Sequence, residues 1–348
     1  MKSFSWSLIS SFALLAAAQP LGKLNVNEVN ERSVITTAQF NTFKYFAQHA
    51  GAAYCNSVNP VGSVITCSDD VCDTVHANGA TILATFSGSA TSLEGYVAQD
   101  SVEGYIVVSM RGSSDLDNFI TDFEFIQESS SLVSGGLVHT GFQTAWNEVS
   151  SAVWSALASA TKKYPSYDIV FTGHSLGAAV ATLGAAYTRN QGYYVDVVNF
   201  GSPRFGNVAL VEYITNDQDG AEWRMTHLDD PVPRLPPIIF GYAHTSPEYW
   251  LSDGTDTTDN YGVSDVVECT GFTNTNCNGG TLGLDIIAHL NYLEPISGCN
   301  SLKFILSKRQ TEQNYVYYLA TSPGQNMTTD QLTTQVNQWS QQDKSASS

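Results

Sequence analysis

The chain has 348 residues, of which 43% are hydrophobic and 14% are charged, which is enough for a single large core and about one big domain. Its formal net charge is −18, so the surface repels nucleic acid and anionic lipid headgroups, which argues against binding either by charge attraction. The simpler interpretation of the charge is that it keeps an exported protein soluble.

The first residues have the pattern of an export signal. Residues 1–18 contain one lysine, then an apolar run, and end in Ala16-Ala17-Ala18. A short apolar region before small residues is typical of a secretory signal peptide and is too short to span a bilayer. Residues 19–32 are polar and indicate a short propeptide or a disordered start. No other segment is apolar enough to cross a membrane, so we expect a secreted, extracellular protein without stable transmembrane association.

Apolar periodicity predicts the main elements in chain order. Strands come first in a run and then alternate with helices, which predicts an α/β fold with a sheet of mixed strand direction. The expected helices are 37–53, 143–163 and 178–186. The expected strands are 79–86, 93–99, 104–109, 168–172, 195–200 and 222–226.

Residues 168–186 read as a strand, a sharp turn and a helix of small residues. The turn carries Gly173-His174-Ser175-Leu176-Gly177. In a nucleophile elbow the serine is held in a strained conformation above the sheet, and the residues two before and two after it must be small. The alternative is that the pattern arose by chance, or that its glycines only let the helix pack on the sheet. The flanking strand and helix favour Ser175 as a nucleophile.

A serine nucleophile needs a base and an acid, which follow it in the order serine, acid, histidine in this kind of fold. Asp230 lies in a rigid, proline-rich turn, residues 229–237, and His289 is the histidine well downstream of it. We expect His289 to take the serine proton and Asp230 to fix its tautomer. Asp229 is the rival acid, and a turn-forming aspartate and a structural imidazole are the alternatives. We expect four other histidines to be structural or exposed: His49, His76, His139 and His174.

The oxyanion that forms during acyl transfer needs two hydrogen-bond donors. The backbone N–H of Leu176, directly after the nucleophile, should be one. Ser113 should supply the other, because Val107 to Gly112 reads as a strand that ends in a turn toward the site.

A short amphipathic pattern follows this loop. Its apolar residues recur at spacings of three and four, with acids between them, which predicts a helix. An ordinary helix with a buried face is the alternative, but its place beside the oxyanion loop favours a movable lid. The expected lid residues are Asp115, Leu116, Asp117, Phe119, Ile120 and Phe123.

Six cysteines in an exported chain indicate disulfides. Cys67 with Cys72 and Cys269 with Cys277 would close small local loops, which leaves Cys55 and Cys299. Six cysteines allow other pairings, so spacing favours this one without fixing it. No two histidines lie near the cysteines at ligand spacing, so we expect no metal.

Residues from about 34 to 300 resemble the class 3 lipases secreted by filamentous fungi, and most of all the Fusarium type. The signatures are Ala53-Tyr54-Cys55, Arg111-Gly112-Ser113, Gly173 to Gly177, Phe200-Gly201-Ser202-Pro203-Arg204, Asp230 to Pro237, Phe240-Gly241-Tyr242, Ser246 to Trp250 and Ala288-His289-Leu290. The resemblance implies an α/β-hydrolase fold, with a mostly parallel mixed sheet, flanking helices and a short helical lid. It also implies the triad Ser175, Asp230 and His289, the oxyanion donors Ser113 and Leu176, and the pair Cys55–Cys299.

The chain departs from the family pattern at several positions. Met110 stands where phenylalanine is common, Phe119 replaces the usual lid tryptophan, and Ala178 replaces a common glycine. Ser130 and Gly136 occupy the region where relatives often have an extra disulfide, so that loop should be looser. Asp122 is retained, where some members use an aspartate to support the oxyanion serine.

The resemblance ends at residue 300, so the domains we expect are a signal peptide (1–18), a propeptide (19–32), a catalytic domain (33–300) and a C-terminal extension (301–348). The extension is rich in Gln, Ser and Thr, and we expect it to be flexible or processed, since Lys308-Arg309 resembles a dibasic cleavage site. It also contains a glycosylation sequon at Asn326.

These patterns predict a secreted, monomeric triacylglycerol lipase that acts on lipid at an oil–water interface without a cofactor. Feruloyl esterase is an alternative on the same fold, against which the apolar lid argues, and phospholipase A1 is another. A catalytically silent binding protein is the alternative from a different class, and the intact order of serine, acid and histidine argues against it.

Overall fold

A mixed sheet of eight strands forms the centre of the computed structural model, which describes residues 35–68, 71–113, 124–299, 316–317 and 327–347. In sheet order the strands are β1 (Thr81–Ser87), β2 (Glu94–Asp100), β3 (Tyr105–Met110), β6 (Asp168–His174), β7 (Val195–Phe200), β8 (Glu222–His227), β9 (Glu248–Leu251) and β10 (Val266–Cys269). Strands β3, β6, β7, β8 and β9 run parallel to one another. The pairs β1–β2, β2–β3 and β9–β10 are antiparallel. The expected α/β sheet of mixed direction is confirmed, and β9 and β10 extend it beyond the predicted strands.

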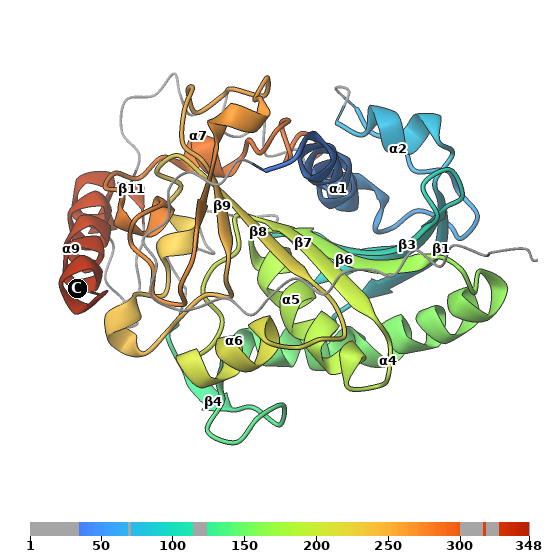
Figure 1. The fold of residues 1–348 in the computed structure, drawn as a ribbon, viewed down its shortest axis with the longest axis horizontal. Helices are drawn as coiled ribbons and strands as arrows, with labels where there is room; N and C mark the ends of the chain where they lie inside the picture. The colour runs from blue at the N-terminus through green and yellow to red at the C-terminus, as the bar shows by residue number, and fades with distance from the viewer. Residues whose placement is uncertain (1–34, 69–70, 114–123, 300–315, 318–326, 348) are drawn as a thin grey trace, which may run out of the picture.

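Helices cover both faces of the sheet (Figure 1). They are α1 (Thr37–Asn56), α2 (Asp73–Ala77), α4 (Thr140–Lys163), α5 (Leu176–Arg189), α6 (Val208–Thr215), α7 (Ile286–His289) and α9 (Thr329–Ser347). Helix α1 lies on one face, and α4, α5 and α6 lie on the other (Figure 1). Single 3-10 turns are η1 (Val232–Arg234), η2 (Ile238–Phe240), η3 (Val263–Asp265) and η4 (Asn278–Gly280), and short two-stranded pairs are β4 (Gln127–Ser129) with β5 (Leu137–His139) and β11 (Val316–Tyr317) with β12 (Met327–Thr328).

The central strands bury side chains on both faces, because successive residues of a strand point to opposite sides. Val107, Val170 and Val198 pack with the core of α1. Their neighbours Phe171 and Val197 pack with the core of α4 and α5. This two-sided burial explains why the predicted strands read as continuous apolar runs.

Local capping explains where the first long helix begins. Thr36 and Gln39 form a reciprocal capping box, in which the Thr36 hydroxyl accepts from the Gln39 N–H and the Gln39 side chain accepts from the Thr36 N–H. The helix ends at Asn56, three residues beyond the predicted end. The Asn56 side chain donates to the Ala52 carbonyl at 3.0 Å and to the Thr66 carbonyl at 2.8 Å, which ties this end to the following loop.

The six cysteines pair as Cys55–Cys299, Cys67–Cys72 and Cys269–Cys277, the pairing that spacing favoured. The first of these joins α1 to Cys299 across 244 residues, so it restricts the unfolded chain most. Across the described ranges, no helix combines the length and the apolar character that a bilayer span requires.

Candidate active site

Ser175 lies on the turn between β6 and α5, at the carboxyl end of the central strands. Its φ of 58° and ψ of −130° are unusual for a residue with a side chain. A Cβ added at Gly173 would come within 2.6 Å of the Gly177 carbonyl carbon, and one at Gly177 would collide with the carbonyl oxygens of Met110 and Arg111. Both glycines are therefore required by close backbone contacts, as a nucleophile elbow demands.

The loop after β3 lies against Ser175. A Cβ on Gly112 would approach the Ser175 Cβ and the His174 carbonyl, both at 2.9 Å, so only glycine fits here. Ser113 follows directly and is partly buried. Leu176 is the first residue of α5, where backbone N–H groups have no partner within the helix. The expected lid (residues 115–123, including the expected support residue Asp122) lies outside the described residues.

Asp230 and His289 come together from two distant loops. The Nδ1 atom of His289 lies 2.7 Å from Asp230 Oδ2, and both side chains are fully buried. The same carboxylate accepts the Tyr292 hydroxyl at 2.5 Å through Oδ2 and the Val232 N–H at 2.8 Å through Oδ1. Burial and the adjacent Asp230 hold the pKa of Tyr292 well above its usual range, so its hydroxyl stays a donor.

The rival acid points elsewhere. A Cβ at Gly283 would collide with the Asp229 carboxylate, which places that carboxylate beside Gly283 instead of the His289 ring. The geometry therefore favours Asp230 over Asp229 as the partner of His289.

Ser175 Oγ and His289 Nε2 do not form a hydrogen bond with each other. Within the described part of the chain, Ser175 Oγ and His289 Nε2 are both buried and neither has a hydrogen-bond partner. In a serine esterase these two atoms exchange the proton of the nucleophile. Catalytic hydrogen bonds of this kind are often long without substrate and tighten in the reacting complex.

Three residues that the sequence analysis did not place in the site hold His289 in position. The His174 ring packs on the His289 ring with centroids 4.5 Å apart, and its Nε2–H donates to the His289 carbonyl at 2.8 Å. Burial and then the neighbouring His289 hold the pKa of His174 well below its usual range, so the neutral ring accepts the Tyr54 hydroxyl at Nδ1, at 2.7 Å. Gly201, with a φ of 59°, lets the His289 ring approach closely, since a Cβ there would lie 3.0 Å from its Cε1.

The signals for these residues were present in the sequence but carried no role by themselves. His174 is the second residue of the elbow pentapeptide, and Gly201 lies in the Phe200-Gly201-Ser202 signature at the end of β7. Tyr54 lies on α1 and Tyr292 follows α7. Local sequence patterns do not reveal that both hydroxyls bond to residues of the same candidate site.

Comparison with known proteins shows which family the chain resembles. The family model described as lipase (class 3) matches residues 107–240. The secreted mono- and diacylglycerol lipase 1 of Fusarium solani is 45% identical over 294 residues, which cover 84% of this chain and 88% of that protein. The secreted mono- and diacylglycerol lipase A of Penicillium cyclopium is 36% identical over 291 residues, which cover 82% of this chain and 94% of that protein. The solved mono- and diacylglycerol lipase from Aspergillus oryzae is 37% identical, with a TM-score of 0.72, over 76% of this chain and all (100%) of that one.

The chain belongs to the class 3 lipase family. It is therefore a carboxylic ester hydrolase with the α/β-hydrolase fold, as the resemblance implied.

Two further histidines of the lipase hold the site loops. His227, at the end of β8, bonds the Ala288 carbonyl through Nδ1 at 2.9 Å and the Tyr261 hydroxyl through Nε2 at 2.6 Å. His244 donates from Nε2 to the Pro233 carbonyl at 2.7 Å, inside the turn that follows Asp230. Burial, and next the charge of Arg224, keep the pKa of His244 well below its usual range. His227 therefore supports residues 281–289, called the histidine loop below, and His244 supports residues 229–237, called the acid loop.

Three of the four histidines that were expected to be structural or exposed have such surroundings, whereas His174 contacts His289 in the candidate site. His49 and His139 are buried and bonded to neighbouring groups, and burial lowers their pKa values to about 3 and about 4. His76 is exposed on α2. His174 is buried, as described above.

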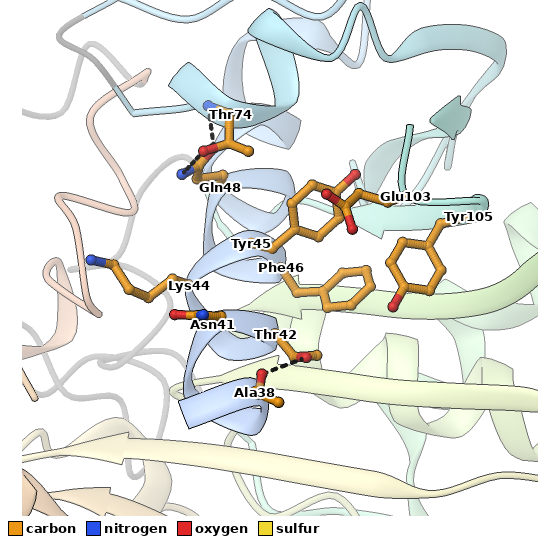
Figure 2. A pocket seen from close by; sticks show the side chains of 10 residues that line it. All are labelled: Ala38, Asn41, Thr42, Lys44, Tyr45, Phe46, Gln48, Thr74, Glu103 and Tyr105. Atoms are coloured by element: carbon orange, nitrogen blue, oxygen red, sulfur yellow. Dashed lines mark hydrogen bonds between the residues drawn. The ribbon is translucent and has the colours of Figure 1, made fainter. Parts of the chain in front are cut away.

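A hollow of about 520 Å³ lies between α1 and the start of β3, at the end of the strands opposite to Ser175 (Figure 2). Its charged lining residues are Lys44 and Glu103, and its ten lining residues include no serine, cysteine or histidine. Figure 2 shows Lys44 directed away from Glu103. This hollow therefore does not repeat the pairing of a serine with a histidine that the candidate site at Ser175 contains.

Proposed function

We propose that this lipase hydrolyses acylglycerol esters with Ser175 as nucleophile, His289 as general base and Asp230 as the orienting acid. The observation that carries the proposal is the buried contact of 2.7 Å between His289 Nδ1 and Asp230 Oδ2, beside an elbow serine with positive φ. The relatives' names, mono- and diacylglycerol lipases, support acylglycerols as the substrate class. Triacylglycerol, which the sequence analysis favoured, stays a prediction within that class.

The proposed reaction needs only groups of this chain, the ester and water. Ser175 Oγ attacks the ester carbonyl carbon while His289 Nε2 takes its proton. The backbone N–H groups of Leu176 and Ser113 stabilise the oxyanion. His289 then gives the proton to the departing glycerol oxygen, and an acyl-serine remains.

Water completes the cycle. His289 removes a proton from the water as its oxygen attacks the acyl carbon. The second oxyanion then collapses while His289 returns that proton to Ser175 Oγ, which releases the fatty acid and restores the free serine. Asp230 keeps the ring in the tautomer with the proton on Nδ1, which leaves Nε2 free to accept. The Tyr292 hydroxyl and the Val232 N–H hold the carboxylate still while the charge of the ring changes.

We further propose that the chain is exported and works as a monomer at a lipid surface. The relatives' names describe them as secreted, and residues 1–18 have the pattern of a signal peptide. The same proposal includes a propeptide at residues 19–32 and a lid formed by residues 115–123.

The test measures hydrolysis of tributyrin as its concentration passes the solubility limit, beside dibutyrin, monobutyrin, a phospholipid and methyl ferulate. Activity on the glycerides that Ser175→Ala abolishes is the expected result, and a rise when droplets appear would support the lid. Retained glyceride hydrolysis in Ser175→Ala would overturn the triad. Smooth saturation on methyl ferulate with little action on glycerides would overturn the substrate class.

A further inference from the structure

The C-terminal helix α9 lies beside the two loops that carry Asp230 and His289, although it comes from the segment expected to be a flexible or processed extension. Figure 1 shows it at the edge of the molecule, next to the segments coloured for residues 270–290. It contacts η2, which follows the acid loop, and η4, which precedes the histidine loop. One helix therefore reaches both loops.

Its carboxylate Asp343 holds the acid loop. This side chain is buried and accepts the N–H groups of Ile238 and Ile239 at 3.0 and 3.1 Å. It also pairs with Arg204 Nη1 at 3.1 Å, and the same nitrogen donates to the Arg234 carbonyl at 2.7 Å and to the Pro236 carbonyl at 2.9 Å. A single carboxylate thus fixes the backbone that runs on from the catalytic aspartate.

The other polar contacts of α9 reach the histidine loop. The Asn337 side chain accepts the Gly283 N–H at 2.7 Å. Ser340 accepts from Arg234 Nη1 at 3.3 Å, and Arg234 Nη2 donates to the carbonyls of Asp229 and Gly283 at 2.9 and 2.7 Å. Arg234 therefore bridges the acid loop and the histidine loop, and α9 contacts the bridge from outside.

An apolar face of α9 also contacts both the acid loop and the histidine loop. Leu332, Val336 and Trp339 recur at spacings of four and three, which places them on one face of a helix. They pack in one buried cluster with residues of the acid loop and of α7, the helix that ends in His289: Val232, Leu235 and Ile286. Burial of this face favours the docked helix over a solvated one.

Charge makes the docked position specific. Arg204 is buried, and burial lowers its pKa, with Asp343 the largest opposing influence. A buried guanidinium without a carboxylate partner is strongly unfavourable, so detaching α9 would leave Arg204 with carbonyl acceptors alone.

We propose that α9 is a positioning element of the catalytic pair, and that Asp343 and Asn337 set the distance and angle between Asp230 and His289. This inference rests on the triad of the proposed function. Neither residue touches substrate or the reacting atoms. Each acts through the loop it holds.

The experiment compares four variants of the full chain on soluble p-nitrophenyl butyrate: Asp343→Asn, Asp343→Glu, Asn337→Ala and the control Gln338→Ala, on the exposed face of the same helix. We expect kcat to fall about tenfold in Asp343→Asn, and less in Asn337→Ala, with KM little changed, because small misplacements of catalytic groups slow the chemical step. Asp343→Glu keeps the charge and should recover part of the loss. Gln338→Ala should match the parent chain.

Two results would overturn the inference. One is a lower melting temperature with an unchanged kcat at 25 °C in Asp343→Asn and Asn337→Ala, which would leave α9 with a structural role only. The other is a raised KM at constant kcat, which would place α9 in substrate binding. Should Asp343→Asn fail to fold, Asn337→Ala decides, since it keeps the ion pair with Arg204. Ser175→Ala, assayed in parallel, separates this question from the triad: residual activity there would reject the triad itself.

Discussion

The two sides of the candidate site are built in different ways. Ser175 is set by a local unit, in which a strand, a turn and a helix adjacent in sequence fix the strained backbone. Asp230 and His289 are 59 residues apart and lie on two loops that contact each other and α9. The nucleophile side should therefore tolerate little change in backbone volume, whereas the acid–histidine side should be sensitive to the loss of individual hydrogen bonds.

Asp230→Asn should have the largest effect on the rate. The amide keeps the shape of the side chain but can stabilise the wrong tautomer of His289, and such a change typically lowers kcat by about 10⁴-fold. The loss should appear in steady-state hydrolysis of a soluble ester, and Asp229→Asn serves as the matched control. A larger loss in Asp229→Asn than in Asp230→Asn would reverse the acid assignment.

Gly177→Ala tests the nucleophile side. The added Cβ would collide with the carbonyl oxygens of Met110 and Arg111, so the backbone must shift, at a cost of about 1–3 kcal/mol in the free energy of unfolding. Gly262→Ala is the control, because its Cβ would meet nothing closer than 3.5 Å. Urea denaturation measures both variants, and equal stability of the two would show that the elbow is not tightly constrained.

The nucleophile side, which is formed by residues adjacent in sequence, is also the side that the sequence predicted best. The pentapeptide, with a strand before it and a helix after it, is enough to predict the elbow, although Gly177 also lies against the carbonyl oxygens of Met110 and Arg111. The sheet strands could be predicted because both of their faces are buried and they read as apolar runs. The order of serine, acid and histidine reduced the choice to two aspartates and one histidine, but local patterns could not separate Asp229 from Asp230. That choice depends on where residue 283 lies in space, since the Asp229 carboxylate lies against it.

The residues that support the acid–histidine side could not be predicted for the same reason. Tyr292 reads as an ordinary aromatic residue, and its role follows from a contact with a residue 62 positions earlier. Helix α9 is rich in Gln and Ser, which is typical of a solvated tail. Its docking depends on a carboxylate, Asp343, that finds Arg204 139 residues away in the sequence. Such contacts have no local periodicity.

Tyr292→Phe sharpens the comparison, because it removes one hydrogen bond from the Asp230 carboxylate and keeps the ring. A hydrogen bond to a charged group contributes about 1.5–3 kcal/mol, so kcat should fall by roughly tenfold to a hundredfold, less than in Asp230→Asn. Steady-state kinetics measures the loss, and Tyr213→Phe, which removes an exposed hydrogen bond to Asn190 instead, is the matched control. An unchanged kcat in Tyr292→Phe would mean that the Val232 N–H alone holds the carboxylate.

The last prediction concerns acid stability and the buried histidine of α1. His49 on α1 is fully buried, and burial lowers its pKa to about 3. Its folded-state pKa is therefore below the unfolded value of about 6.5, so the unfolded chain binds the extra proton as the pH falls. The stability that the neutral ring contributes is complete above about pH 6.5 and is lost progressively toward pH 3.

Replacing His49 should flatten this pH dependence. In His49→Gln the free energy of unfolding should fall less steeply between pH 6 and 4, by about 1.4 kcal/mol per pH unit, because one proton no longer distinguishes the two states. His76→Gln, at an exposed position on α2, should keep the slope of the parent chain. Urea denaturation across this pH range measures both slopes. If His49→Gln kept the parent slope, acid lability would belong to the loops of the acid–histidine side, where His244 is also held neutral by burial, and the nucleophile side would be the more acid-resistant of the two.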